Sequence, residues 1–145
     1  MKEITVDAMI ENMNTVTAFV DDFLNQIACP MKSRIQINIV IDEIFGNICH
    51  YAYKDSVGAV TVRVESGNTP KAVFLTFTDN GIPYNPLDTE DPDITLSSEE
   101  RKIGGLGIYL VKKNMDEMKY EYVNQQNRLW MEKDCKTWEK INDYT

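Results

Sequence analysis

The sequence contains very little histidine. Only one, His50, occurs in 145 residues. A zinc site of the HExxH type needs two histidines, so this class of metal centre is excluded. A Ser-His-Asp triad is possible only through His50.

Cysteine is also scarce. Cys29, Cys49 and Cys135 are odd in number, lie far apart and form no CxxC pair. This spacing argues against a structural zinc site and against a disulfide framework. We expect free thiols that pack as small apolar side chains.

Long apolar runs and an excess of basic residues are absent too. No segment approaches the roughly 18 apolar residues of a membrane span, and the N-terminal residues lack the apolar core of a signal peptide. The 23 acidic residues outnumber the 15 basic ones, for a formal net charge of −8. Such an acidic surface argues against binding to nucleic acid or anionic membranes, and we expect a cytoplasmic protein.

The residues present predict one globular domain over residues 1–145, since 43% are hydrophobic and the length suits a single core. Apolar periodicity predicts five strands, at residues 2–6, 59–65, 72–78, 119–124 and 129–134. It predicts helices at residues 12–28, 32–53 and 106–115, and a frayed turn or short helix at 136–145. This order favours an α+β fold, a two-layer sandwich of a mixed, mostly antiparallel sheet with helices on one face.

The second predicted helix carries three polar side chains that form a candidate functional site. Glu43 and Asn47 lie one helical turn apart, and His50 falls on the same stripe. A carboxylate can accept a proton from a hydroxyl or water, and an amide oxygen is a suitable Mg²⁺ ligand. From the spacing alone, an ordinary solvated helix face is the simpler interpretation.

Two glycine motifs follow. Asp79 ends an apolar strand and precedes Asn80 and Gly81, an arrangement that can bind an amino group beside a flat ring but is also common turn chemistry. The run from Gly104 to Gly107 enters a helix, where backbone N–H groups can converge on an anion, although a hinge is the simpler interpretation. Between them, the residues up to 103 form a loop unusually long for a small domain.

Taken in order, the three motifs resemble the GHKL ATPase and kinase superfamily. Glu43–Asn47 with the following HYAY resembles the N box, Asp79–Gly81 the G1 box, and Gly104–Gly107 the G2 box, so that residues 84–103 correspond to the ATP lid. Sensor histidine kinases need a further phosphoacceptor histidine, and gyrase-like members need a further domain. The chain is therefore most similar to the stand-alone anti-sigma factor serine/threonine kinases.

The resemblance implies a role for each motif. Glu43 would be the general base, Asn47 would bind Mg²⁺, and Asp79 would accept a hydrogen bond from the adenine amino group. The remaining residues expected at the ATP site are His50, Gly81, Ile82, Arg101, Lys102, Gly104, Gly105, Leu106 and Gly107. Family members often carry a Gly-Thr pair in the last hairpin, where the threonine assists adenine recognition, but Gln126-Asn127-Arg128 stands here.

The implied function is that of an ATP- and Mg²⁺-dependent protein kinase that sequesters a sigma factor and phosphorylates a serine of a STAS-type anti-anti-sigma protein. The family also suggests a homodimer, for which residues 3–28 are the expected surface. One alternative is a nucleotide-dependent binding switch without kinase activity. Another is a nucleotide-free interaction domain, against which Asp79 and the glycines argue.

Overall fold

A computed structural model describes residues 1–54, 56–88 and 105–135 of the chain, with side chains from residue 107 in the last of these ranges. Five strands form one sheet in the order β1-β2-β3-β5-β4, and each neighbouring pair is antiparallel. The strands are β1 (Lys2–Asp7), β2 (Ala59–Ser66), β3 (Ala72–Asp79), β4 (Glu117–Val123) and β5 (Gln126–Asp134). The predicted α+β sheet is confirmed, with antiparallel pairing throughout the described strands.

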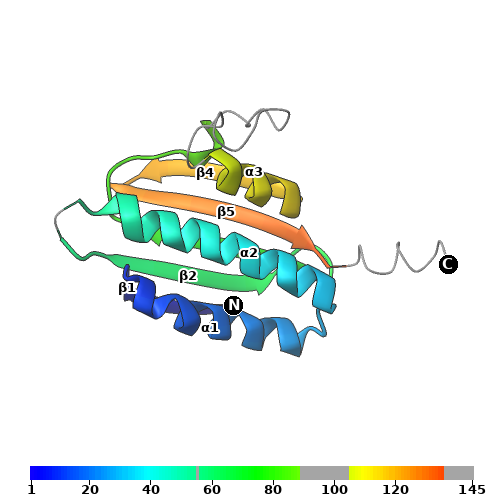
Figure 1. The fold of residues 1–145 in the computed structure, drawn as a ribbon. Helices are drawn as coiled ribbons and strands as arrows, with labels where there is room; N and C mark the ends of the chain where they lie inside the picture. The colour runs from blue at the N-terminus through cyan, green and yellow to red at the C-terminus, as the bar shows by residue number, and fades with distance from the viewer. Residues whose placement is uncertain (55, 89–104, 136–145) are drawn as a thin grey trace.

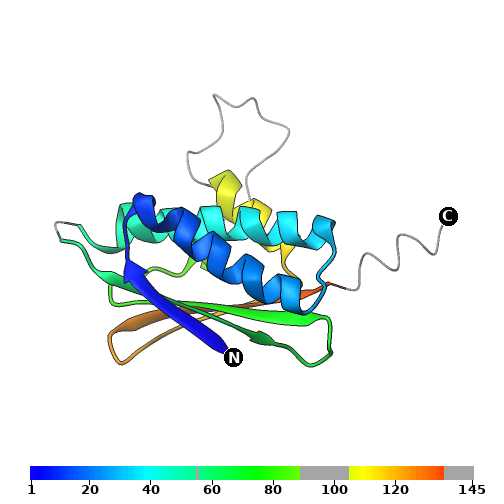
Figure 2. The same ribbon diagram turned by 90° about the horizontal axis from the view of Figure 1, so that it is seen from below.

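The helices form the second layer. Figure 1 shows α2 (Met31–Asn47) over the middle of the sheet, between α1 (Met13–Gln26) and α3 (Gly105–Asn114). Figure 2 shows that these three helices all lie on one face of the sheet. Three short turns complete the order: η1 (Ile10–Asn12), the π-helical turn η2 (Ile48–Ala52) and η3 (Pro86–Asp88).

The core lies between the two layers, because alternate strand residues face the helices. Val60, Val62 and Val64 of β2 are fully buried, as is Ile41 of α2. The opposite sheet face carries polar cross-strand pairs, such as Arg63 with Glu3 at 3.3 Å. One sheet face is therefore apolar and covered, as the strand alternation predicts.

Two boundaries differ from the sequence prediction. The second helix does not continue to Tyr53 as an α-helix, since its last turn is the π-helical η2. The final hairpin turns at Asn124 and Gln125, whose φ angles are 54° and 63°. Two central residues with positive φ make a two-residue type I′ turn, which matches the strand twist. Gln126 and Asn127, predicted to lie in the turn, therefore belong to β5.

Among the described residues, no helix is both long enough and apolar enough to cross a bilayer.

Candidate functional site

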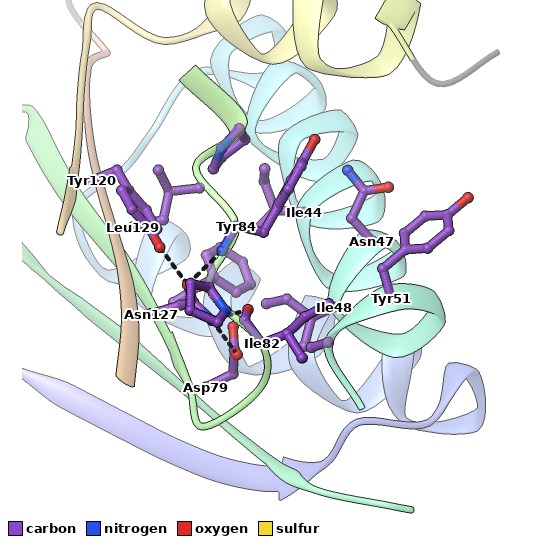
Figure 3. A pocket seen from close by; sticks show the side chains of 14 residues that line it. Ile44, Asn47, Ile48, Tyr51, Asp79, Ile82, Tyr84, Tyr120, Asn127 and Leu129 are labelled. Carbon is purple, nitrogen blue, oxygen red and sulfur yellow. Dashed lines mark hydrogen bonds between the residues drawn. The ribbon is translucent and has the colours of Figure 1, made fainter. Parts of the chain in front are cut away.

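A cavity of about 130 Å³ opens between the end of α2, the end of β3 and the start of β5. Its walls are largely apolar and aromatic, with Asp79 and Asn127 as polar groups at its floor (Figure 3). The lining residues are Ile44, Asn47, Ile48, Tyr51, Ala52, Phe77, Asp79, Ile82, Pro83, Tyr84, Pro86, Tyr120, Asn127 and Leu129. An apolar slot with a few convergent polar groups suits a flat, partly polar ligand.

Asp79 is the last residue of β3 and is only 6% exposed. Its Oδ1 accepts hydrogen bonds from the Gly81 N–H at 2.8 Å and the Asn127 Nδ2 at 3.0 Å. Among the described residues no donor reaches Oδ2, so that oxygen is left to accept from a ligand. Burial raises the pKa of Asp79, and the two hydrogen bonds oppose this rise.

Asn127 connects the floor of the cavity to the segment after β3. It stands directly opposite Asp79 in the antiparallel register. Its Nδ2 also donates to the Ile82 carbonyl at 2.8 Å, while its Oδ1 accepts from the Tyr84 N–H at 3.0 Å and from the Tyr120 hydroxyl (Figure 3). Both ends of this one amide are engaged, so its orientation is fixed. Asn127 thereby fixes the beginning of the predicted lid to the sheet.

Glu43 lies outside the cavity lining, against the first turn of α3. A Cβ placed on Gly107 would lie 2.7 Å from the Glu43 Cδ and would overlap its carboxylate. Glycine at this position lets α3 lie this close to the Glu43 carboxylate without displacing that side chain. The first backbone N–H groups of a helix have no intrahelical partner and favour a negative group nearby. The predicted base and the predicted phosphate-binding turn are thus in contact.

Asn47 lines the cavity one turn after Glu43, but His50 does not. His50 is exposed, with its ring 6.1 Å from that of Tyr51. The prediction that His50 shares the stripe of Glu43 assumes α-helical rotation. The π-helical turn changes that rotation, and Tyr51 lines the cavity instead.

Gly81 and Ile82, which precede the predicted lid, pack against η2. A Cβ on Gly81 would lie 2.6 Å from the Ala52 Cβ, and the Ile82 N–H donates to the Ala52 carbonyl at 3.0 Å. The space left by the missing Gly81 side chain is therefore filled by Ala52. Ile82 lines the cavity, whereas Gly81 does not.

Part of the predicted phosphate site lies outside the described residues. Arg101, Lys102, Gly104 and most of the predicted lid are among the residues that the structure does not describe. The turn or helix predicted at 136–145, which is not part of the phosphate site, also lies outside the described residues. Gly105 and Leu106 are described as backbone at the start of α3. Of the lid, residues 84–88 are described, with Asn85 Oδ1 accepting from the Leu87 N–H at 2.9 Å.

The cavity is also lined by Tyr51, Tyr84, Tyr120 and Asn127, which the motifs in the sequence do not predict as site residues. The signal for Asn127 was present in Asn124, a residue type that tolerates positive φ. A two-residue turn beginning there places Asn127 inside the strand. Tyr51 stands in the HYAY run, but only the π-helical turn brings it to the cavity. Tyr84 and Tyr120 belong to no motif, and packing alone brings them there.

Comparison with known proteins gives the family. Residues 6–133 match the family described as histidine kinase-like ATPase domain. The chain belongs to this family. The matched range includes the segments that resemble the N, G1 and G2 boxes, the β2–β3 hairpin between the first two of them, and nearly all of the β4–β5 hairpin. The resemblance to the GHKL superfamily is confirmed. Membership implies ATP binding at the level of the family.

One curated relative is a protein kinase. Over 98 residues, 68% of each chain, the domain is 26% identical to the serine/threonine-protein kinase BtrW of Bordetella bronchiseptica.

Two solved structures share the fold. The histidine kinase domain of the blue-light activated histidine kinase EL346 from Erythrobacter litoralis aligns with a TM-score of 0.57 and 16% identity, covering 77% of this chain. The RsbU and RsbW domains of Rv1364c from Mycobacterium tuberculosis align with a TM-score of 0.59 and 14% identity, covering 92%. The chain spans 49% and 32% of those two chains, so the likeness concerns the ATPase fold alone.

Proposed function

We propose that this chain is an ATP-dependent protein serine/threonine kinase that also acts as an anti-sigma factor. It would sequester a sigma factor and phosphorylate a serine of a STAS-type anti-anti-sigma protein. The family and the similarity to BtrW support a kinase of this type. The partners come from the resemblance, as do the homodimer and its expected surface at residues 3–28.

The observation that carries the proposal is the contact of Glu43 with the first turn of α3. A protein that only binds nucleotide has no need of a carboxylate beside the turn that receives the phosphates. A kinase does, because the base must reach the attacking hydroxyl where it meets the γ-phosphate. In this arrangement Glu43 accepts the proton of the incoming serine.

The residues present fit ATP and Mg²⁺. The apolar cavity accepts a flat base, the Asp79 Oδ2 accepts from an amino group, and the glycine at 107 leaves backbone N–H groups near the phosphates. Asn47 would hold Mg²⁺ with its amide oxygen, and Arg101 and Lys102 would add positive charge. Mg²⁺ takes few protein ligands beside phosphates and water, and when bound it neutralises phosphate charge.

Nucleotide binding is tested by thermal unfolding with ATP and Mg²⁺. A ligand that binds only the folded state raises Tm, by an amount that grows with its concentration over Kd. We expect a rise for the unmodified protein and none for Asp79→Asn, which replaces the acceptor oxygen by a donor. Absence of a shift in the unmodified protein would contradict every nucleotide-dependent function.

Kinase activity is tested with radiolabelled ATP and a STAS-type antagonist protein. We expect Glu43→Gln to reduce phosphoryl transfer by about 100-fold or more while the ATP-induced rise in Tm persists. Asp42→Asn, a change at an exposed neighbouring carboxylate, is the matched control and should transfer phosphate normally. ATP binding without any transfer would instead favour the nucleotide-dependent switch.

A further inference from the structure

At the far end of the sheet from the cavity, the fold brings two cysteines together. Cys29 follows α1 and Cys135 follows β5, 106 residues apart in the sequence, and their sulfur atoms are 3.0 Å apart. Figures 1 and 2 both show the end of β5 beside the connection between α1 and α2. Asp79 and Ala72 end β3 on opposite sides, so roughly 20 Å of strand separates the pair from the nucleotide site.

We propose that Cys29 and Cys135 are an oxidation site, which hydrogen peroxide converts into a reversible intramolecular disulfide. The proposal does not depend on the kinase activity. Both residues are free cysteines here, and a bond between them needs the sulfur atoms to approach by about 1 Å. Such a small movement is available to side chains without unfolding the chain.

The backbone around the pair is held from both sides by Lys71, in the β2–β3 connection. Its Nζ donates to the Ile27 carbonyl at 3.0 Å, just before Cys29. Its own carbonyl accepts the N–H of Cys135 at 3.0 Å. One residue therefore fixes both cysteine-bearing segments, so the short sulfur distance is built into the fold.

The surroundings favour the reactive thiolate at Cys29. The hydrogen bond with Cys135 lowers the pKa of Cys29, burial opposes this, and the positive charges of Arg34, Lys71 and Lys133 lower it further. The pKa of Cys135 is raised by the same hydrogen bond and by burial. Cys29 also keeps 6% of its surface exposed against 1% for Cys135, so Cys29 is the first to meet an oxidant.

The oxidation takes two steps. The Cys29 thiolate attacks one peroxide oxygen, the O–O bond breaks, and a sulfenic acid forms on Cys29. The hydroxide released takes up the proton that the Cys29 thiol lost and becomes water. The Cys135 thiol then attacks that sulfur, the S–S bond forms, and the sulfenic hydroxyl leaves with the thiol proton as water. The two sulfurs lose two electrons in total, and peroxide is reduced to two waters.

Cys49 provides an internal control. It lies in η2, remote from the pair in the chain, and burial raises its pKa to about 11. At neutral pH it therefore stays a thiol and should react slowly.

The test treats the reduced full-length chain with hydrogen peroxide, blocks remaining thiols under denaturing conditions and maps the peptides. We expect a Cys29–Cys135 link within one chain, one blocked thiol at Cys49, and reversal by dithiothreitol. Cys49→Ser should form the link as fast as the unmodified chain. In Cys135→Ser the sulfenic acid of Cys29 should persist and be trapped by dimedone.

Thermal unfolding gives a second readout that needs no variant. The disulfide closes a long loop, so the oxidised form should have a Tm higher by roughly 5 °C or more. The ATP-induced shift should be unchanged, since the pair is remote from the cavity. The proposal is overturned if peroxide links Cys49, joins two chains, or takes Cys29 to sulfinic acid without a bridge.

Discussion

At the scale of single residues, burial of the Asp79 carboxyl group raises its pKa and affects stability. Its carboxylate is buried at the cavity floor with two donors on one oxygen. Because burial raises its pKa, the folded protein binds this proton more tightly than the unfolded chain does. The charge that suits ligand binding therefore lowers the stability of the free protein at neutral pH.

This gives a prediction for Asp79→Asn. The amide oxygen keeps both hydrogen bonds but carries no charge, so at pH 7 the variant should be at least as stable as the unmodified protein. The difference in the free energy of unfolding between the two proteins should shrink as the pH falls from the raised pKa of Asp79 in the folded state to its lower pKa in the unfolded chain. Below both values residue 79 is neutral in both proteins. Urea unfolding at several pH values measures this, and a variant that is less stable at pH 7 would refute it.

A second prediction concerns Asn127. Asn127→Ala removes the amide oxygen that accepts from the Tyr120 hydroxyl and from the Tyr84 N–H, and it removes one donor from Asp79. We expect a loss of about 1–3 kcal/mol in the free energy of unfolding and weaker ATP binding. Gln126→Ala, the preceding residue on the other face of β5, is the control for chemical denaturation and thermal shift. Equal effects of the two changes would argue against a special role for Asn127.

At the scale of elements, α1 ends in a strained residue. Ala28 has φ of 54°, the Cys29 N–H donates to the Leu24 carbonyl at 2.9 Å, and the Ala28 N–H donates to the Asn25 carbonyl at 3.1 Å. The Cys29 bond, the helix end and the positive φ together resemble a Schellman ending, in which glycine usually occupies the left-handed position. The Cβ of alanine makes this conformation unfavourable.

Ala28→Gly should therefore stabilise the protein by about 1 kcal/mol, measured by urea unfolding under reducing conditions. Ala18→Gly makes the same chemical change at an exposed position inside α1 and should instead destabilise by about 1 kcal/mol. The opposite signs separate backbone strain from any general effect of glycine. The same sign for both would show that strain at residue 28 is not the cause.

The packing of α3 against α2 yields the next prediction. Gly107→Ala introduces a methyl group that overlaps the Glu43 carboxylate, so Glu43 must move. A displacement of about 1 Å at a catalytic group can lower the reaction rate about 100-fold. If Glu43 is the base, as proposed, we expect the rate of phosphoryl transfer to fall by that factor. Leu110→Ala, on the exposed side of the same helix, should retain transfer. Full activity of Gly107→Ala would argue that Glu43 does not take part in phosphoryl transfer.

At the scale of the whole molecule, the strand order determines where stability resides. β3 lies at the centre of the sheet, paired with β2 and β5, while β1 and β4 are edges. Backbone amides paired on both sides and buried under helices open least often. Hydrogen exchange should therefore be slowest in β3 and its inward neighbours and faster in β1 and β4. Slower hydrogen exchange in β4 than in β3 would contradict this order.

Much of the fold follows from the sequence because its patterns are local. Alternation of apolar residues identified the strands, and the 3.6-residue period identified the helices, to within a few residues. The motif residues were recognised because they stand where elements begin or end: Asp79 closes a strand and Gly105 begins a helix. Local propensity did not reveal the π-helical turn, whose last residue, Ala52, packs against Gly81 from a distant part of the chain.

Local patterns in the sequence were thus enough to predict most of the elements, the three motifs and the family resemblance. Which residues meet depends instead on the tertiary structure. The hydrogen bond between Asp79 and Asn127, 48 residues apart, depends on the register of β3 and β5, which the turn at Asn124 sets. The contacts of Glu43 with Gly107 and of Cys29 with Cys135 depend on helix packing over the sheet. Such contacts join distant parts of the chain, and no local pattern records them.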